Sequence, residues 1–289
     1  GAGGLAVIIP PSSLAVLLGS LAQIDVGALL VAGFLPGLVL TALYILLITA
    51  QAAIDKDAAP QYDTPRASLR EKIGAVLVNV VPMGVIVFLV VGTILLGIAS
   101  PTESAALGCL GVIGLLLAYR RFSWSVVWKS LDDAMKVTGM TFLIIAASTT
   151  FAQVLAFSGA SSGMIQWFVS FQWTPYAMLA VMVGVILVLG MFMDQLSMML
   201  ITLPIFIPIA NSLGFDLVWF GLILLLAYEI GFTTPPFGLL LFVMIGVAPP
   251  GTTLGTVSLA ALPYILCTIG LVVLIVIFPP LALWLPRLM

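Results

Sequence analysis

The sequence predicts an all-α polytopic membrane protein that contains an inverted repeat, broken helices and a re-entrant hairpin. Hydrophobic residues make up 63% of the chain and charged residues 7%, whereas soluble domains carry about 25% charged residues. Several apolar runs reach the roughly 20 residues with which a helix crosses a bilayer. In addition, a double proline interrupts two apolar segments at matching places. Together these observations define the predicted fold class.

The composition argues against two other kinds of protein. A net charge of -2 does not provide the basic face that nucleic-acid binding requires. The chain has no histidine and so lacks the commonest metal ligand and the usual general base. We therefore expect no enzymatic activity, no organic cofactor and no nucleic-acid partner. A membrane-embedded enzyme would need facing catalytic groups, and the acidic pair Asp132 and Asp133 has no second acidic motif to face.

The apolar runs give the elements in chain order. Two shorter runs, 175–193 and 195–213, are joined by a polar turn and are treated separately below. The longer runs predict membrane spans over residues 26–51, 73–98, 102–119, 137–157, 216–248 and 253–285.

Two connections between the spans carry most of the positive charge. Positive loops stay in the cytoplasm, and the two spans between these connections allow both to lie there. We predict a cytoplasmic loop over 52–72 and an interfacial helix over 122–136, because Trp124, Trp128 and Leu131 follow a helical spacing. A surface loop is the alternative for 122–136. The basic residues are Lys56, Arg66, Arg70 and Lys72 in the first connection and Arg120, Arg121, Lys129 and Lys136 in the second.

Residues 8–40 share a pattern with residues 233–266. The pair Pro10–Pro11 matches Pro235–Pro236, and a proline near the start of the following span occurs in both copies, as Pro36 and Pro263. In each copy a short helix follows the double proline, then a turn, then a long span. This shared order predicts a duplication, and inverted duplications are typical of secondary transporters. A helix that is merely kinked for packing is the alternative.

The second break has the chemistry of an ion site. Because Pro235 and Pro236 have no amide hydrogen, carbonyls of the preceding turn lose their helical partners. Gly231 permits an unwound backbone, and Thr233 and Thr234 add hydroxyls. Oxygen ligands at membrane depth suit a hard cation such as Na+. The half-helix that starts near Phe237 directs its positive end at the break, where it would favour an anionic group.

Polar residues also gather between the two shorter runs. Gly190, Asp194, Gln195 and Ser197 separate two apolar arms, and irregular backbone at membrane depth is tolerated where it is buried in protein or lines a cavity. We therefore predict a re-entrant hairpin over 175–213, with two full spans as the alternative.

Three carboxylates, those of Glu103, Asp194 and Glu229, are predicted in or near the apolar layer, where ionisation is costly. Glu103 follows Pro101 and Thr102, which indicates helix capping. We expect Asp194 and Glu229 to support the cation site electrostatically or to hold helix ends together. No arginine lies in the apolar spans, so a substrate carboxylate would rely on helix ends and on the hydroxyls of Ser12, Ser197, Thr202 and Thr233.

Four motifs carry a family resemblance, in the order LAVIIPPS, SPTESAALG, LGMFMDQLSMMLITLPIFIPI and YEIGFTTPPFGLLLFV. Together they resemble the large membrane subunit of TRAP (tripartite ATP-independent periplasmic) transporters over the whole chain. The resemblance implies a sodium-coupled elevator-type importer of organic acids, a multi-pass protein of the bacterial inner membrane. It also implies two partners, a periplasmic substrate-binding protein and a small four-helix membrane subunit, separate or fused.

The same resemblance implies the organisation of the chain and its sodium sites. Residues 1–51 and 173–289 would belong to the transport domain and 73–172 to the scaffold. Family members carry further helices, including a serine-bearing first hairpin, so we expect additional sequence before Gly1. Where this chain has Ala6, family members usually have glycine. The implied sodium ligands are Gly190, Gly231, Thr234 and Phe237 at one site and Ala6, Ile9 and Pro11 at the other.

Two further functions stay open from the sequence. One is an elevator carrier for dicarboxylates or citrate that works without a binding protein. The other is a structural or channel subunit that transports nothing itself, although such a subunit would have no need of paired broken helices.

Overall fold

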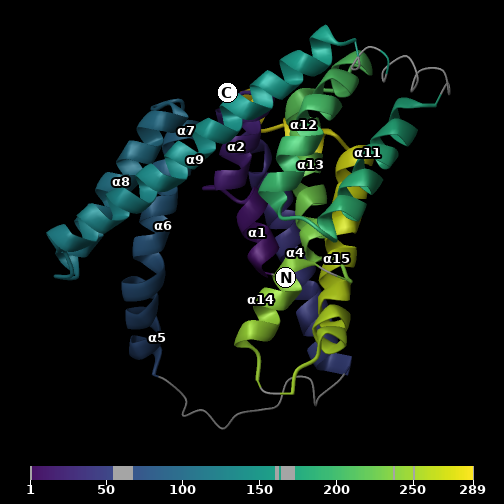
Figure 1. The fold of residues 1–289 in the computed structure, drawn as a ribbon. Helices are drawn as coiled ribbons and strands as arrows, with labels where there is room; N and C mark the ends of the chain where they lie inside the picture. The colour runs from purple at the N-terminus through teal and green to yellow at the C-terminus, as the bar shows by residue number, and fades with distance from the viewer. Residues whose placement is uncertain are drawn as a thin grey trace. The chain divides into compact units, whose positions relative to one another are not determined.

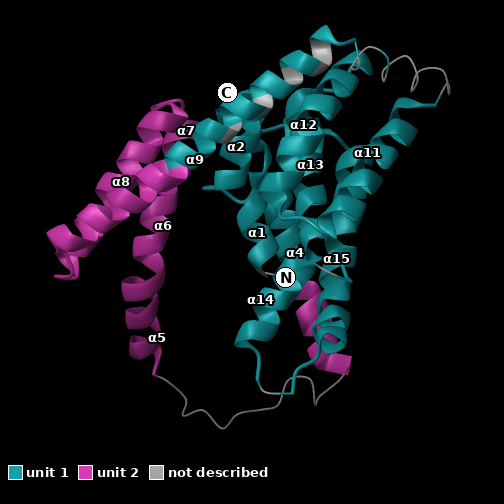
Figure 2. Ribbon diagram, in the orientation of Figure 1, with its two compact units in different colours: residues 1–44, 138–288 teal, residues 45–137, 289 magenta. Residues whose placement is uncertain are grey.

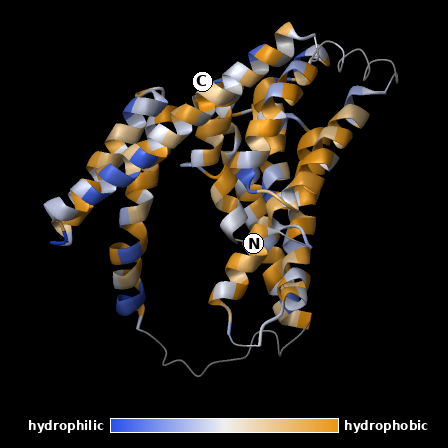
Figure 3. Cartoon of the chain, viewed as in Figure 1, coloured by the Kyte–Doolittle hydropathy of each residue, from blue (hydrophilic) through white to orange (hydrophobic). Residues whose placement is uncertain are grey.

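All regular secondary structure in the described residues is helical, as predicted. The structure is a computed structural model, and it describes residues 2–54, 68–159, 163, 173–236, 238–249 and 251–288. Six helical stretches in this described part are long and apolar enough to cross a membrane, and Figure 3 shows how apolar residues dominate the helices. The chain is therefore a polytopic membrane protein. It divides into two units: residues 1–44 with 138–288 form unit 1, and 45–137 with 289 form unit 2 (Figure 2).

The first predicted break is present in unit 1. Helix α1 (Ala2–Ile8) ends before the double proline, and α2 (Ser13–Ala22) begins directly after it. Ser12 joins the two halves, because its hydroxyl accepts a hydrogen bond from the Ala15 amide at 3.2 Å and donates one to the Val7 carbonyl. Two helices complete this copy, α3 (Val26–Ala32) and α4 (Phe34–Ile54).

The second break has the same construction. Helix α13 (Leu217–Thr233) ends at the threonine pair, α14 (Leu239–Val247) follows the prolines, and α15 (Leu254–Ile277) is the long helix of this copy. The Pro10–Pro11 and Pro235–Pro236 peptide bonds are both cis. In Figure 1, α1 leads upwards into α2 whereas α13 leads downwards into α14, so the two broken helices run in opposite directions.

The hairpin arms are α11 (Pro175–Gly190) and α12 (Gln195–Ser212), joined by the turn Met191–Asp194. Both arms pack on α13, which also contacts α1, α2, α3 and α15. As a result every residue from Trp219 to Gly231 is buried. The second broken helix is therefore the centre of unit 1.

Two predicted boundaries need correction. The last helix was expected to reach residue 285, but α15 ends at Ile277, since Pro279 and Pro280 cannot donate helical hydrogen bonds. The short helices α16 (Pro280–Leu283) and η3 (Pro286–Leu288) follow it. The interfacial helix 122–136 and the span 137–157 were expected as separate elements, but α9 (Trp124–Phe157) runs through both without a proline to end it. The surface-loop alternative for 122–136 is therefore wrong.

Unit 2 contains the predicted spans 73–98 and 102–119. The first is helical up to Leu95 but alternates between helix types, and the second is α8 (Pro101–Ala118). Ser104 of α8 shares a 2.8 Å hydrogen bond with Thr93, and Gly108 lies against Val90. Most of the predicted loop 52–72, including Lys56 and Arg66, lies outside the described residues. The segments of the first span are α5 (Leu69–Ala75), η1 (Val76–Val80), α6 (Val81–Val87), η2 (Phe88–Gly92) and α7 (Thr93–Leu95).

Candidate functional site

The tip of the hairpin touches the second broken helix through two glycines. A Cβ atom on Gly190 would lie 2.4 Å from the Gly231 Cα and 2.9 Å from the Gly231 carbonyl oxygen. A Cβ on Gly231 would in turn lie 3.0 Å from the Ile186 carbonyl oxygen. Because real Cβ contacts are longer than 3.0 Å, a side chain on Gly190 would force α11 away from α13. The structure thus brings together Gly190 and Gly231, two of the predicted sodium ligands.

The backbone of the second break is held open by local hydrogen bonds. Thr234 is extended (φ -82°, ψ 129°), and its amide donates to the Gly231 carbonyl at 3.1 Å instead of continuing the helix. The Phe232 carbonyl loses its helical donor because Pro236, four residues on, has no amide hydrogen. The Gly238 amide returns to the Thr234 carbonyl at 3.1 Å. The Gly231 carbonyl, whose helical donor position is occupied by Pro235, therefore lies beside the hairpin tip. Phe237, the fourth predicted ligand, lies outside the described residues.

The two threonine hydroxyls of this break point back along α13. Thr234 Oγ1 donates to the Ile230 carbonyl at 2.6 Å, and Thr233 Oγ1 donates to the Glu229 carbonyl. Each hydroxyl oxygen keeps lone pairs that can accept a hydrogen bond or coordinate a cation.

Asp194 caps the second arm of the hairpin. Its Oδ2 accepts hydrogen bonds from the amides of Leu196 at 3.0 Å and Ser197 at 3.2 Å, and its Oδ1 accepts one from the Ser197 hydroxyl at 2.5 Å. This arrangement satisfies amides at the start of α12. Asp194 therefore holds a helix end at the tip, and its hydrogen bonds also engage Ser197.

A hydrogen bond from Gln195, the residue after Asp194, joins Glu229 to the hairpin. Gln195 Nε2 donates to Glu229 Oε2 at 2.6 Å, and Glu229 is only 7% exposed. Gln195 belongs to the polar cluster predicted from the sequence, but its pairing with Glu229, which lies 34 residues away, was not predicted.

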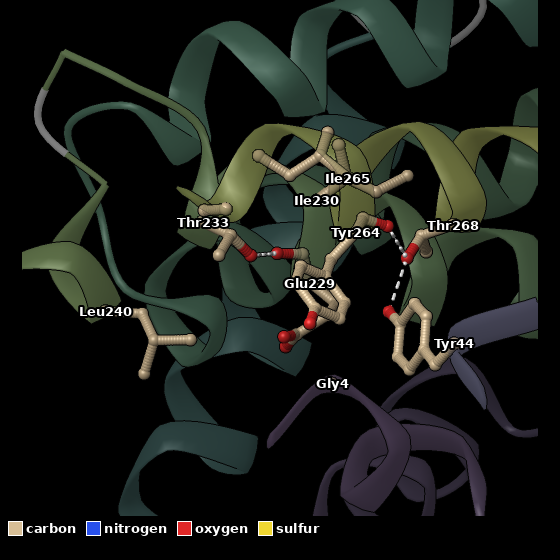
Figure 4. Close-up of a pocket in the computed structure, with 10 residues that line it drawn as sticks. Gly4, Tyr44, Glu229, Ile230, Thr233, Leu240, Tyr264, Ile265 and Thr268 are labelled. Atoms are coloured by element: carbon tan, nitrogen blue, oxygen red, sulfur yellow. Dashed lines mark hydrogen bonds between the residues drawn. The ribbon is translucent and has the colours of Figure 1, made fainter. Parts of the chain in front are cut away.

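A cavity of about 30 Å³ lies beside the Glu229 carboxylate. Polar side chains of α4, α13 and α15 line it, and Figure 4 shows them around the cavity. The Tyr44 hydroxyl shares a 2.9 Å hydrogen bond with Thr268 Oγ1, and the Tyr44 and Tyr264 rings meet edge to face at 5.2 Å. Sequence analysis did not select these three residues. The sequence did contain a signal for them, because their hydroxyl groups occur in otherwise apolar spans. The polar lining consists of Tyr44, Glu229, Thr233, Tyr264 and Thr268.

The first break is supported by Gly33, which joins α3 to α4, and by Gly37 of α4. A Cβ on Gly33 would lie 2.1 Å from the Ile8 carbonyl oxygen, and one on Gly37 would lie 2.4 Å from Ile9 Cγ1. Of the predicted ligands, Ala6 lies in the last turns of α1, whereas Ile9 and Pro11 lie in the break itself.

The four predicted substrate residues lie in different surroundings. Ser12 is buried at the first break, Ser197 is at the hairpin tip, and Thr233 lines the small cavity. Thr202 instead lies inside the contact between α12 and α13, where its hydroxyl is bonded to the Met198 carbonyl and to the Tyr228 hydroxyl, each at 2.7 Å. A larger cavity of about 460 Å³, lined by residues of α2, α9 and α12, has none of the four among its described lining residues.

Glu103 belongs to unit 2 and caps α8. Its carboxylate accepts a hydrogen bond from the Ser100 amide at 2.7 Å, and the Ser100 hydroxyl accepts one from the Glu103 amide at 3.4 Å. This is a capping box, which agrees with the interpretation of Glu103 as a helix cap.

Comparison with known proteins gives a consistent picture. Residues 1–281 match the family described as "Tripartite ATP-independent periplasmic transporter, DctM component". The C4-dicarboxylate TRAP transporter large permease protein DctM of Pseudomonas aeruginosa is 34% identical over 99% of this chain and 66% of its own length. The sialic acid TRAP transporter permease protein SiaT of Haemophilus influenzae is 31% identical over 98% of this chain and 45% of its own length. An ectoine/5-hydroxyectoine TRAP transporter large permease protein, UehC of Ruegeria pomeroyi, is 30% identical over 98% of this chain and 65% of its own length. The chain therefore spans less than two thirds of each of these relatives.

Proposed function

This chain belongs to the DctM family of tripartite ATP-independent periplasmic transporter components, and on that premise we propose that it forms the large membrane-spanning part of a sodium-coupled, binding-protein-dependent importer of organic acids. The family consists of transport components rather than enzymes, so the membrane-enzyme alternative is excluded.

The contact between Gly190 and Gly231 carries the proposal. It sets the hairpin tip directly against the last turn of α13, where the helical donor positions for the Gly231 and Phe232 carbonyls are occupied by Pro235 and Pro236, which have no amide hydrogen. Sodium favours such oxygen ligands and is often bound where transporter helices are interrupted. We assign this sodium site to the backbone at Gly190 and Gly231, to Thr234, and to Phe237 by the family resemblance.

A second sodium site at the first break is part of the same proposal. Its assigned residues are Ala6, Ile9 and Pro11. The first break resembles the second in its double proline and its short following helix, and the two broken helices run in opposite directions (Figure 1). This arrangement is what an inverted repeat requires, and it supports one ion position in each copy.

An organic acid would be held by partial charges and hydroxyls. Helix α14 begins at the second break, and the start of a helix favours an anion. The Thr233 and Ser12 hydroxyls lie at the two breaks, whereas Ser197 is engaged by Asp194 and Thr202 by Tyr228. We propose Thr233 and Ser12 as the nearer contacts and Ser197 and Thr202 as supporting residues. Relatives are named for C4-dicarboxylates and sialic acid, both carboxylic acids.

The mechanism and partners follow the family. In our proposal residues 1–51 and 173–289 provide the transport domain, which moves as an elevator, and residues 73–172 provide the scaffold. A periplasmic binding protein delivers the substrate, a small four-helix membrane subunit supports the scaffold, and the complex lies in the bacterial inner membrane as a symporter.

Uptake into proteoliposomes tests this proposal. The full-length protein would be reconstituted with its small subunit, and entry of radiolabelled C4-dicarboxylates and sialic acid would be measured with an inward sodium gradient. Uptake should require sodium and the periplasmic binding protein together. Uptake that persists without the binding protein would instead favour the independent dicarboxylate or citrate carrier. No uptake of any acid under any gradient would favour a structural subunit.

Replacing Thr234 by alanine tests the sodium site at the second break in the same assay. Removing its hydroxyl should raise the sodium concentration that gives half-maximal uptake. An unchanged sodium dependence would count against the site. The control is Thr41→Val, which should leave the sodium dependence unchanged. Among the described contacts, the Thr41 hydroxyl donates one hydrogen bond, to the Gly37 carbonyl of its own helix at 2.8 Å.

A further inference from the structure

Two side-chain hydrogen bonds join the α12 arm of the hairpin to α13, one inside the contact and one at the tip. The Thr202 and Tyr228 hydroxyls are 2.7 Å apart, and Gln195 Nε2 donates to Glu229 Oε2 at 2.6 Å. Gln195 and Thr202 are seven residues apart in sequence, so they lie on the same face of α12. Their partners are consecutive residues of α13. The two bonds therefore fix one register of α12 along α13.

The tip of the hairpin has little apolar packing to hold it in place. None of the residues 191–197 is buried, whereas Met198 and Met199, directly after the tip, are completely buried. Burial of apolar surface stabilises a contact in proportion to the area removed from water, and this contribution becomes large only from Met198 onwards. At the tip itself, the glycine contact described above and the hydrogen bond from Gln195 join the hairpin to α13.

Glu229 is a well-fixed partner for that hydrogen bond. It is 7% exposed, and α1 and α13 contact each other. A Cβ on Gly4 of α1 would lie 2.9 Å from Glu229 Oε1 and 3.2 Å from Glu229 Cγ, and Figure 4 shows Gly4 beside the carboxylate. Helix α1 therefore limits the movement of this side chain. An amide N–H can donate to a carboxyl oxygen in either protonation state, so the bond does not depend on ionisation of Glu229.

We propose that Gln195 is a positioning residue whose hydrogen bond to Glu229 holds the hairpin tip against the last turn of α13. Through the tip, Gln195 sets how closely Gly190 approaches Gly231, and both glycines are assigned to the sodium site at the second break. The position of the tip is argued from these contacts alone. The effect on sodium binding rests on the proposed function.

Amide hydrogen exchange, measured by mass spectrometry on the purified full-length protein without sodium, tests the position of the tip. Gln195→Leu removes the donor at a part-exposed position. We expect exchange of the amides in residues 190–197 to become about fivefold faster, as loss of one hydrogen bond implies. Exchange in α15 should not change, whereas a general loss of stability would accelerate it as well. The matched control is Gln51→Leu, at an exposed glutamine of α4, which should leave both regions unchanged.

Variants of Glu229 test whether Gln195 acts through this partner. Glu229→Leu removes the acceptor and should accelerate exchange at the tip as Gln195→Leu does. Glu229→Gln keeps an oxygen that can accept the bond, so exchange should stay slow. The double variant with both leucines should exchange no faster than either single variant.

Two results of the exchange experiment would overturn the proposal. One is a rate at the tip that is the same in Gln195→Leu as in the natural protein. The other is an additive effect of the two leucine substitutions, which would mean that the residues act separately. If Glu229→Leu does not fold, the comparison of Gln195→Leu with Gln51→Leu still decides the role of Gln195.

The sodium dependence of uptake tests the second part of the inference. Gln195→Leu should raise the sodium concentration for half-maximal uptake by about fivefold and leave the maximal rate nearly unchanged, because it displaces the tip without removing a ligand. Faster exchange at the tip with unchanged sodium dependence would disprove the link to the sodium site. A natural protein without any sodium dependence would count against the proposed function, and the exchange measurements would still decide the role of Gln195.

Discussion

Gly190 and Gly231 bring α11 and α13 into backbone contact, with room for no more than hydrogen on either Cα. A Cβ added to Gly190 would meet the Gly231 Cα at 2.4 Å. Backbone atoms cannot rotate away as the end of a side chain can. The position of the hairpin tip relative to the second break therefore depends on the absence of two side chains.

We expect Gly190→Ala to lower the melting temperature of the purified protein and to weaken sodium binding. Overpacking of this kind costs about 1–3 kcal/mol. Gly184→Ala is the matched control in the same helix, because a Cβ there has nothing within 4 Å. That control should be neutral or stabilising by up to about 1 kcal/mol. Equal melting temperatures for the two variants would contradict the close contact.

Replacement of Asp194 separates helix capping from direct ion binding. Asparagine also caps helices well, whereas alanine costs about 1 kcal/mol. We expect Asp194→Asn to keep both the melting temperature and the sodium affinity, and Asp194→Ala to lose stability. Calorimetry and sodium titration would measure these effects. A large loss of sodium affinity in Asp194→Asn at unchanged stability would instead indicate that the carboxylate binds the ion.

Thr202 and Tyr228 should be coupled energetically. Their hydroxyls are 2.7 Å apart, and both residues are buried. We expect a double-mutant cycle with Thr202→Val and Tyr228→Phe to give a coupling of about 1 kcal/mol in stability. The same cycle with Thr41→Val in place of Thr202→Val should give none. A zero coupling for the first pair would show that the hydrogen bond adds nothing to stability.

The first break should be as sensitive to added volume as the second. In Gly33→Ala the new Cβ would lie 2.1 Å from the Ile8 carbonyl oxygen, so we expect a loss of about 1–3 kcal/mol. Gly3→Ala serves as the control, since its Cβ would have nothing within 4 Å. Thermal unfolding of the two variants side by side measures the difference, and equal stability would disprove tight packing at this break.

The breaks and the turn between α11 and α12 could be predicted because their causes are local. A proline pair removes helical donors wherever it stands, and a polar cluster between apolar arms is visible in sequence. The bond from Gln195 to Glu229 and the space that Gly4 leaves could not be predicted, because they depend on how distant helices cross. Thr202 was predicted as a substrate contact because of its hydroxyl near a break, yet the helical turn directs it into the interface with Tyr228. The end of α15 at Ile277 was not predicted, although Pro279 and Pro280 follow it and prolines are a sequence signal for the end of a helix.

The enclosure of α13 has a consequence for biosynthesis. Residues Trp219 to Gly231 are shielded by neighbouring helices, among them α15, which is made later. Until α15 emerges from the ribosome, one of the helices that shield α13 and the turn after it from lipid is missing. Carbonyls without hydrogen-bond partners are energetically unfavourable in lipid. We therefore expect chains that terminate before Leu254 to be retained by the insertion machinery and degraded rapidly, which pulse-chase labelling would detect as a shortened half-life.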